Sequence, residues 1–199
     1  QADSIDQLNK KAAVLTKIVE TKDAVADFLS CFEKLFPHGD FFTLNVSSPN
    51  TPNLRDLQEK GLLRELLSAV QQKNIQLAAR AKIDPKAVFV TIAPEMEFAQ
   101  VDEIIDVGEQ GKLTGIVATN ATAFMRDGLK SPNGPQPGGL SGRPITALVT
   151  NFIAHIYRIT QGRLPIIGVG GIFTAQDAYD KIMAGANAVQ IYTGWIFEG

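Results

Sequence analysis

Alternation between strand-like and helix-like segments constrains the fold of this chain more than any other feature. Short runs of strand formers recur along the sequence, and segments with an apolar residue every three or four positions separate them. Most runs are apolar on both faces, which is typical of a parallel sheet covered by helices. Such a sheet is either doubly wound or a (β/α) barrel. The predicted strands are 12–18, 41–46, 88–92, 115–119, 165–169 and 188–192.

The intervening segments predict amphipathic helices, because their apolar residues fall on one face. In the last of them, Thr174 is a plausible N-cap and Gly185 a stop. No helix is expected after the last strand, where the sequence ends. A closed barrel has eight strands and about 250 residues, so six strands predict an incomplete one. The predicted helices cover 23–36, 62–70, 98–105, 145–156 and 175–184.

Composition excludes several classes of protein. With 45% hydrophobic and 20% charged residues, the chain has the balance of a soluble globular domain. Its formal net charge of −2 argues against a nucleic-acid surface. No apolar run approaches the roughly 20 residues that span a bilayer, and the polar start predicts no signal peptide. A single cysteine, Cys31, excludes an internal disulfide and fits a reducing compartment; we expect it to be a packed or surface thiol.

Polar residues follow the second predicted strand, in the segment FFTLNVSSPNTPNLR at 41–55. Asn45 and Asn50 stand at its carboxyl end, and Asn120 stands at the end of 115–119. Ligands sit at that end of parallel strands. Amides suit carboxylate, imide and urea-like groups, although asparagine also caps turns through its own backbone. Three amides at one end of the sheet favour a ligand.

Ser48, in the same segment, is either a turn residue or a group that moves a proton. A nucleophilic serine needs a neighbouring histidine. Only His38 and His155 exist. The first precedes a strand at its amino end and the second lies within a predicted helix, so we expect both to be structural or exposed. A serine hydrolase is therefore disfavoured. A serine that accepts a proton needs a water or a relay.

Glycine-rich turns predict a phosphate site. Gly168-Val169-Gly170-Gly171 connects a strand to a helix, and Tyr192-Thr193-Gly194 ends the next strand. Loops after the last two strands of a barrel often bind phosphate through backbone N–H groups. The segment 138–142, GGLSG, adds a third set of donors. The alternative is that these glycines only serve tight turns.

Three further features are a long loop, two aromatic residues near the end of the sequence, and the spacing of possible metal ligands. The aperiodic loop 121–139 is either a lid or a mobile surface loop, since connections of this length are uncommon. Trp195 and Phe197 are expected to be core or docking residues. No His, Cys, Asp and Glu grouping has the spacing of metal ligands.

The chain resembles the dihydroorotate dehydrogenase family, in its quinone-dependent (class 2) branch. The other branch carries cysteine where this chain has Ser48. The resemblance runs from about residue 12 to the end of the chain. Its motifs are LNVSSPNTPNLR (44–55), VFVTIAPE (88–95), GIVATNAT (115–122), GGLSGRPI (138–145), ITQGRLPIIGVGGI (159–172) and AVQIYTGWIF (188–197).

The resemblance implies an FMN-containing TIM-type (β/α) barrel that oxidises dihydroorotate to orotate in pyrimidine biosynthesis and passes the electrons to a quinone. Ser48 is implied as the catalytic base. The implied substrate ligands are Asn45, Asn50 and Asn120. The implied FMN contacts are Asn45, Thr119, Gly142, Gly170, Gly171, Tyr192 and Thr193.

The sequence also departs from the family. The family has lysine at Thr91 and a second threonine at Ala121, and it places two strands and a quinone-guiding domain before this point. We therefore expect residues 1–199 to form one FMN-binding domain that lacks the amino-terminal strands and closing helix. A homo-oligomer, a partner chain or the missing residues would cover the open sheet edges.

Two other functions are open. One is a non-catalytic relative that keeps the phosphate pocket and acts as a subunit or scaffold. The other is a different phosphate-binding barrel enzyme, which leaves the motif NVSSPNT unexplained. We expect a cytoplasmic location, or one peripheral to the cytoplasmic membrane through a segment outside this chain.

Overall fold

The computed structural model describes residues 24–50, 53–127 and 129–199. Their strands form one parallel sheet whose spatial order, β1-β2-β3-β4-β5, follows the chain. A doubly wound sheet reverses its order at a switch point, whereas the strands of a barrel do not. The order therefore selects the barrel arrangement, of which this sheet is a part. The strands are β1 (Phe41–Asn45), β2 (Ala87–Ile92), β3 (Gly115–Ala118), β4 (Ile166–Val169) and β5 (Ala188–Gln190).

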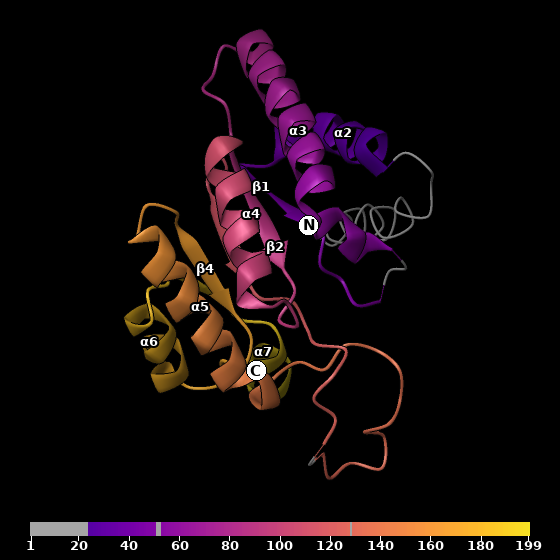
Figure 1. The fold of residues 1–199 in the computed structure, drawn as a ribbon, viewed down its shortest axis with the longest axis vertical. Helices are drawn as coiled ribbons and strands as arrows, with labels where there is room; N and C mark the ends of the chain where they lie inside the picture. Colours follow the sequence, from indigo (N-terminus) through magenta and orange to yellow (C-terminus); the bar gives the residue numbers. More distant parts are fainter. Residues whose placement is uncertain (1–23, 51–52, 128) are drawn as a thin grey trace.

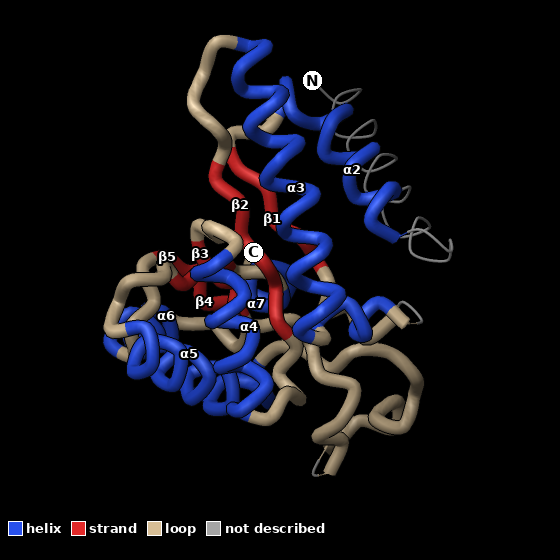
Figure 2. The backbone as a smooth tube through the Cα atoms, turned by 45° about the horizontal axis from the view of Figure 1, so that its top comes forward, coloured by secondary structure: helices blue, strands red, loops and turns tan. Residues whose placement is uncertain are grey.

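All five predicted strands that fall within the described residues are confirmed, with ends that shift by no more than two residues. The sixth predicted strand, 12–18, lies outside the described residues. In Figure 2 the strands lie side by side and the helices stand around them. The helices are α2 (Ala24–Leu35), α3 (Lys60–Ala81), α4 (Phe98–Gln110), α5 (Thr146–Thr160), α6 (Ala175–Met183) and α7 (Thr193–Glu198), with 3₁₀ turns η2 (Phe36–His38), η3 (Leu54–Gln58) and η4 (Arg143–Ile145).

The core lies between the sheet and helices α2 to α6. Alternate strand residues such as Leu44 and Val88 point to this side and are almost fully buried. They pack in the same hydrophobic core as the apolar stripes of α3, α4 and α5, and consecutive helices contact one another from α2 through α6. The helical periodicity therefore identified the buried faces correctly.

Helix α6 begins as predicted. The Thr174 hydroxyl accepts a hydrogen bond from the Asp177 N–H at 3.1 Å, and the Asp177 carboxylate accepts from the Thr174 N–H at 2.8 Å. The N–H of Phe173 also donates to this carboxylate and, with the other donors, lowers the pKa of Asp177. The cap fixes where α6 starts after the glycine turn.

The two edges of the sheet are open within the described residues, because β1 and β5 each pair on one side only. Phe41 on β1 is 55% exposed. Trp195 and Phe197 were expected to be core or docking residues. The core position is wrong, since they are 70% and 75% exposed, and the docking role stays a prediction. They lie on α7, so the expectation that no helix follows the last strand is wrong. This helix leaves no sign in the sequence because six residues are too few to show a helical period.

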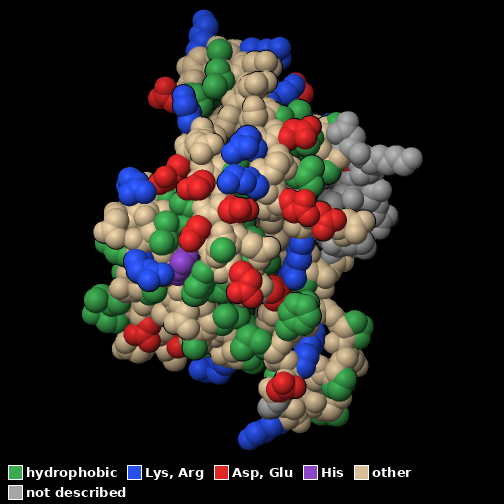
Figure 3. Space-filling model, viewed as in Figure 1, with side chains coloured by type: hydrophobic (Ala, Val, Ile, Leu, Met, Phe, Trp, Pro, Cys, Tyr) green, Lys and Arg blue, Asp and Glu red, His purple; other side chains and the backbone are tan. Residues whose placement is uncertain are grey.

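The surface and the long loop complete the description. On the face shown in Figure 3, positive and negative side chains are interspersed rather than gathered by sign. None of the helices in residues 24–50, 53–127 and 129–199 combines the length and the apolarity needed to cross a bilayer. The described parts of the loop 121–139, which are 121–127 and 129–139, project from the body of the molecule (Figure 1). The ends of the loop are joined by an antiparallel bridge between Thr122 and Leu140.

Candidate functional site

A cavity of about 590 Å³ opens at the carboxyl ends of the strands. Its volume lies within the usual range for a site that binds a cofactor or small molecule. Residues from all five strands or from the loops that follow them contribute to its wall. Eight predicted site residues line it: Asn45, Asn50, Thr119, Asn120, Gly170, Gly171, Tyr192 and Thr193.

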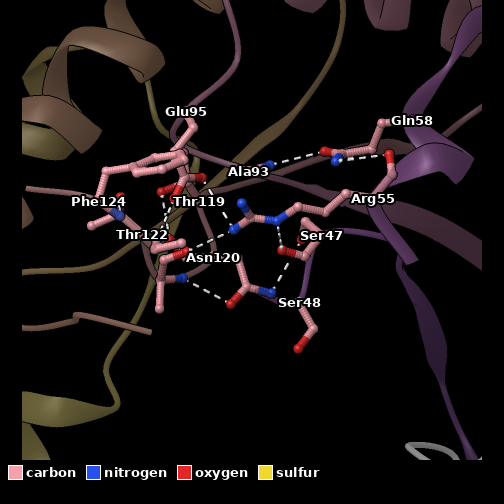
Figure 4. Close-up of polar contacts among 12 residues, drawn as sticks. Ser47, Ser48, Arg55, Gln58, Ala93, Glu95, Thr119, Asn120, Thr122 and Phe124 are labelled. Carbon is pink, nitrogen blue, oxygen red and sulfur yellow. Dashed lines mark hydrogen bonds and ion pairs between the residues drawn. The ribbon is translucent and has the colours of Figure 1, made fainter. Parts of the chain in front are cut away.

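Two predicted site residues stand just outside this lining. Ser48 lies between the lining residues Asn45 and Asn50, is half-buried, and accepts a hydrogen bond at Oγ from the Asn50 N–H at 3.3 Å. Its side chain points away from Arg55 in Figure 4. Gly142 has φ 82° and follows the lining residue Ser141. A Cβ at Gly142 would come within 3.0 Å of the Thr193 methyl carbon, so Gly142 borders the part of the cavity wall that contains Thr193.

Asn120 joins the loops that follow β1 and β3. Its Nδ2 donates to Asn45 Oδ1 at 3.2 Å and to Ser47 Oγ at 3.1 Å. Its Oδ1 accepts from the Ala121 N–H at 2.8 Å. These bonds fix which end of the amide faces which loop. The structure thus brings together two of the three predicted amides in direct contact, with the third, Asn50, on the same cavity wall.

The two histidines have no part in this cavity. His155 is buried between α4 and α5, where its Nε2 lies 2.7 Å from Asp102 Oδ1 and its ring stacks on Phe98. His38 belongs to η2, before β1 and at the opposite end of that strand from Ser48. The expected structural role of His155 is confirmed. The described hydrogen bonds give Ser48 no histidine partner, so the arrangement is not that of a serine hydrolase.

The glycine turns form the opposite wall. Gly171 has φ 69°, and a Cβ there would lie 2.1 Å from Thr146 Oγ1, so only glycine fits. The backbone N–H groups of Gly170, Gly171 and Thr193 have no hydrogen-bond acceptor among the described residues. A hydrogen bond of 2.8 Å between Ser141 Oγ and Thr193 Oγ1 joins two of the loops. Unpaired N–H groups around a cavity suit an anion.

Buried contacts hold this wall from behind. Thr146 Oγ1 donates to the Gly171 carbonyl at 2.9 Å. The amine of Lys181, a fully buried residue on α6, donates to the Thr146 carbonyl at 3.4 Å and to Thr150 Oγ1 at 3.3 Å. Burial lowers the pKa of Lys181, and the carboxylates of Asp177 and Asp180 partly oppose that shift. Hydrogen bonds from Thr146 and Lys181 therefore support the turn from behind.

Sequence reasoning missed the residues that tie the loops together. Arg55, on η3, contacts the loops after β1, β2 and β3, and its carboxylate partner is Glu95. The available signal was weak: an arginine in the polar segment after β1 and a carboxylate just after β2. Which loops a long side chain reaches depends on tertiary structure. No group of metal-ligating residues occurs among the described residues.

Comparison with known proteins supports one family. The family described as dihydroorotate dehydrogenase matches residues 2–199. A protein of Christiangramia forsetii named dihydroorotate dehydrogenase (quinone) is 46% identical over 183 residues, which is 92% of this chain and 52% of that protein. A protein of the same name from Nostoc punctiforme is 44% identical and is covered to 49% of its length. The chain spans about half the length of these curated relatives.

Solved structures agree with this comparison. The DHODH of Eimeria tenella in complex with ferulenol superposes with a TM-score of 0.86 at 34% identity, covering 90% of this chain and 51% of that one. The ligand-free form of the same enzyme gives a TM-score of 0.83. The superposition covers 90% of this chain, and an identity of 34% indicates a common family as well as a common fold.

Proposed function

Because the chain belongs to the dihydroorotate dehydrogenase family, we propose that its protein oxidises dihydroorotate to orotate in pyrimidine biosynthesis, with FMN as cofactor and a quinone as final electron acceptor. The observation that carries the proposal is the single cavity that joins the amide cluster to the glycine turns. We name a quinone because the curated relatives carry that word in their names.

The volume and the chemistry of the cavity support FMN as the cofactor. Its volume is adequate, and unpaired N–H groups at Gly170, Gly171 and Thr193 suit the phosphate. Thr119 lies in the wall between those turns and the amides. FMN, when bound, supplies the acceptor for the hydride that leaves carbon 6 of the substrate. The phosphate would be gripped by backbone donors, with Tyr192 and Gly142 at the border of that grip.

The amides suit the substrate. Dihydroorotate presents a carboxylate and an imide, which need both donors and acceptors. Asn45 and Asn120 offer both at one point of the wall, and Asn50 adds a third amide. In our proposal they orient the ring so that its carbon 5 faces the loop of Ser48. Orienting groups of this kind contribute to catalysis by removing rotational freedom before the reaction.

Ser48 is proposed to accept the proton from carbon 5 while the hydride leaves carbon 6, so that a double bond forms between the two carbons. A serine hydroxyl is a weak base, so the proton must pass onward through a water or a hydrogen-bonded relay. The half-exposed position of Ser48 allows such a path. The scaffold alternative is not carried forward, because the named relatives are enzymes.

The test uses the full-length protein reconstituted with FMN. Dihydroorotate added without oxygen should bleach the visible absorbance of the flavin, and Ser48→Ala should slow this at neutral pH by about 100-fold or more. Ser68→Ala, an exposed serine on α3, is the control and should leave the rate unchanged. Unchanged bleaching in Ser48→Ala would remove Ser48 from the mechanism. Protein that never binds flavin would overturn the proposed function.

A further inference from the structure

Arg55 links three loops that follow three neighbouring strands. Its Nε donates to the Ser47 carbonyl at 3.1 Å, after β1. Its Nη2 donates to the Ala121 carbonyl at 3.3 Å, after β3, and lies 3.1 Å from the carboxylate of Glu95, after β2. Figure 4 shows the guanidinium at the centre of these contacts. One side chain thus holds the carboxyl ends of β1, β2 and β3 together.

Glu95 extends the same network. One of its carboxylate oxygens accepts from the Ala123 N–H, and the other pairs with Arg55. Next to Ala123, Thr122 pairs with Leu140 at the base of the loop 121–139. A second residue of η3, Gln58, accepts from the Ala93 N–H at 3.0 Å. The turn η3 is therefore anchored to the loop after β2 at two points.

These contacts bear directly on the predicted site residues. The Ser47 carbonyl belongs to the peptide group that leads into Ser48, so Arg55 fixes the plane from which Ser48 departs. Ala121 is held at its carbonyl by Arg55, and its N–H donates to the Asn120 side chain at 2.8 Å. Arg55 is therefore linked to Ser48 through the peptide group after Ser47, and to Asn120 through the backbone of Ala121.

The chemistry of the pair suits fixed geometry. The side chains of Arg55 and Glu95 are only 27% and 14% exposed. A guanidinium presents its donors in a rigid planar fork that here bonds two carbonyl groups and pairs with a carboxylate, whereas a lysine amine is a single flexible point charge and would not reach all three groups. Removing one member of a partly buried pair leaves the other charge without its partner. The pair is thus sensitive to substitution at either residue.

We propose that Arg55, with Glu95, is a positioning pair that fixes the placement of Ser48 and Asn120 across the site. This inference rests on the proposed function for its catalytic consequence, but its structural part does not. The glycine turns proposed to bind the phosphate lie on the loops after β4 and β5. Arg55 does not contact these loops among the described residues. Disturbing Arg55 should therefore affect the substrate side and leave the grip on FMN intact.

The first experiment measures amide hydrogen exchange in the full-length FMN-loaded protein. In Arg55→Gln, exchange should become about tenfold faster in 119–127, because a charge-assisted hydrogen bond to Ala121 is lost, although the two residues are 66 positions apart. Glu95→Gln should give the same pattern. Arg163→Gln is the matched control, because Arg163 pairs with Glu109 at 3.2 Å on the surface. Unchanged exchange in 119–127 in both variants would overturn the proposal.

The second experiment measures substrate-driven flavin bleaching. Arg55→Gln should slow the bleaching by about 10- to 100-fold, as small displacements of reacting groups do. Arg55→Lys, which keeps the charge, should also bleach more slowly than the wild type. Added to Ser48→Ala, Arg55→Gln should have little further effect, because residues that act as a unit are not additive. A merely structural role would instead give additive losses and lower FMN content, and that result would overturn the proposal.

The failure of the proposed function is separate from these outcomes. If the wild-type protein binds FMN but dihydroorotate never bleaches it, the proposed function falls. The exchange experiment would still decide whether Arg55 holds the loop of Asn120. If exchange changes as expected while the wild type is active, a bleaching rate in Arg55→Gln equal to that of the wild type would overturn the catalytic consequence.

Discussion

The two walls of the cavity are built by different means. On the side of β1 to β3, contacts between side chains form the wall and join its loops. Asn120 contacts Asn45, and Arg55 and Glu95 hold the loops. On the side of β4 and β5, the wall consists of glycine turns whose backbone N–H groups are unpaired among the described residues. Side chains distinguish one small molecule from another, whereas a backbone cradle recognises an anion whatever it is attached to.

This difference predicts different responses to mutation. A glycine turn fails when any side chain is added, because its shape depends on space. A side-chain network fails when a donor or acceptor is removed, because its shape depends on polar partners. Substitutions on the two sides should therefore separate FMN affinity from substrate affinity. The following variants run from the largest expected effect to the smallest.

Gly171→Ala should have the largest effect. The added Cβ would meet Thr146 Oγ1 at 2.1 Å in a left-handed backbone conformation. Strain and overpacking together should cost about 3 kcal/mol of unfolding free energy and weaken FMN binding. Urea unfolding and flavin titration measure the two effects. Gly61→Ala on α3, where a Cβ meets nothing within 4 Å, is the control. Equal stability of the two variants would contradict this view of the turn.

Asn120→Ala should have an intermediate effect. It removes a donor to Asn45 and Ser47 and an acceptor for the Ala121 N–H. Losing these bonds should weaken orotate binding about tenfold, with FMN affinity unchanged. Calorimetric titration of both ligands measures this, with the exposed Asn151→Ala on α5 as the control. A parallel loss of FMN affinity would show that the two walls are not independent.

Lys181→Met should have the smallest effect on the site and a distinct dependence on pH. Burial holds the pKa of Lys181 in the folded protein below 10.5, its value in the unfolded chain. Between the folded-state pKa and 10.5, the unfolded chain therefore binds more protons than the folded protein. Stability therefore rises as the pH rises through that window, and the charged amine is unfavourable below it. Lys181→Met should stabilise the protein by about 1 kcal/mol at neutral pH.

The advantage of Lys181→Met should shrink as the pH approaches 10.5. FMN affinity should not change, because the amine lies behind the turn rather than in it. Urea unfolding at neutral and alkaline pH provides the measurement, with Lys60→Met on the surface of α3 as the control. A constant difference across the pH range would refute the assignment of the effect to the buried charge.

The sequence was sufficient for the parallel strands and for the end of the sheet that carries the site. Strand and helix periods are local, and polar residues that follow parallel strands must meet at one edge, so Asn45 and Asn120 were expected together. The glycine pattern likewise indicated Gly171 before its φ of 69° was known. These features could be predicted because they depend on the local order of residues and on few backbone torsion angles.

The rest depends on tertiary structure. The acceptors of Arg55 lie in loops whose backbone path is set by the whole sheet, and no local pattern joins residue 55 to Ala121. Ser47 and Ser48 are equivalent in sequence, yet only Ser47 contacts Asn120. Helix α7 is too short to show a helical period, and the hydrophobicity of Trp195 gave no sign that its side chain is 70% exposed.

The most direct test compares the affinity of FMN with that of riboflavin, which lacks the phosphate. The central claim is that backbone donors on the loops after β4 and β5 grip the phosphate of a flavin that reaches the amides of β1 and β3. Fluorescence titration of the full-length protein should then give at least about 100-fold tighter binding of FMN, because several charge-assisted hydrogen bonds are at stake. Equal affinities for FMN and riboflavin would contradict the account.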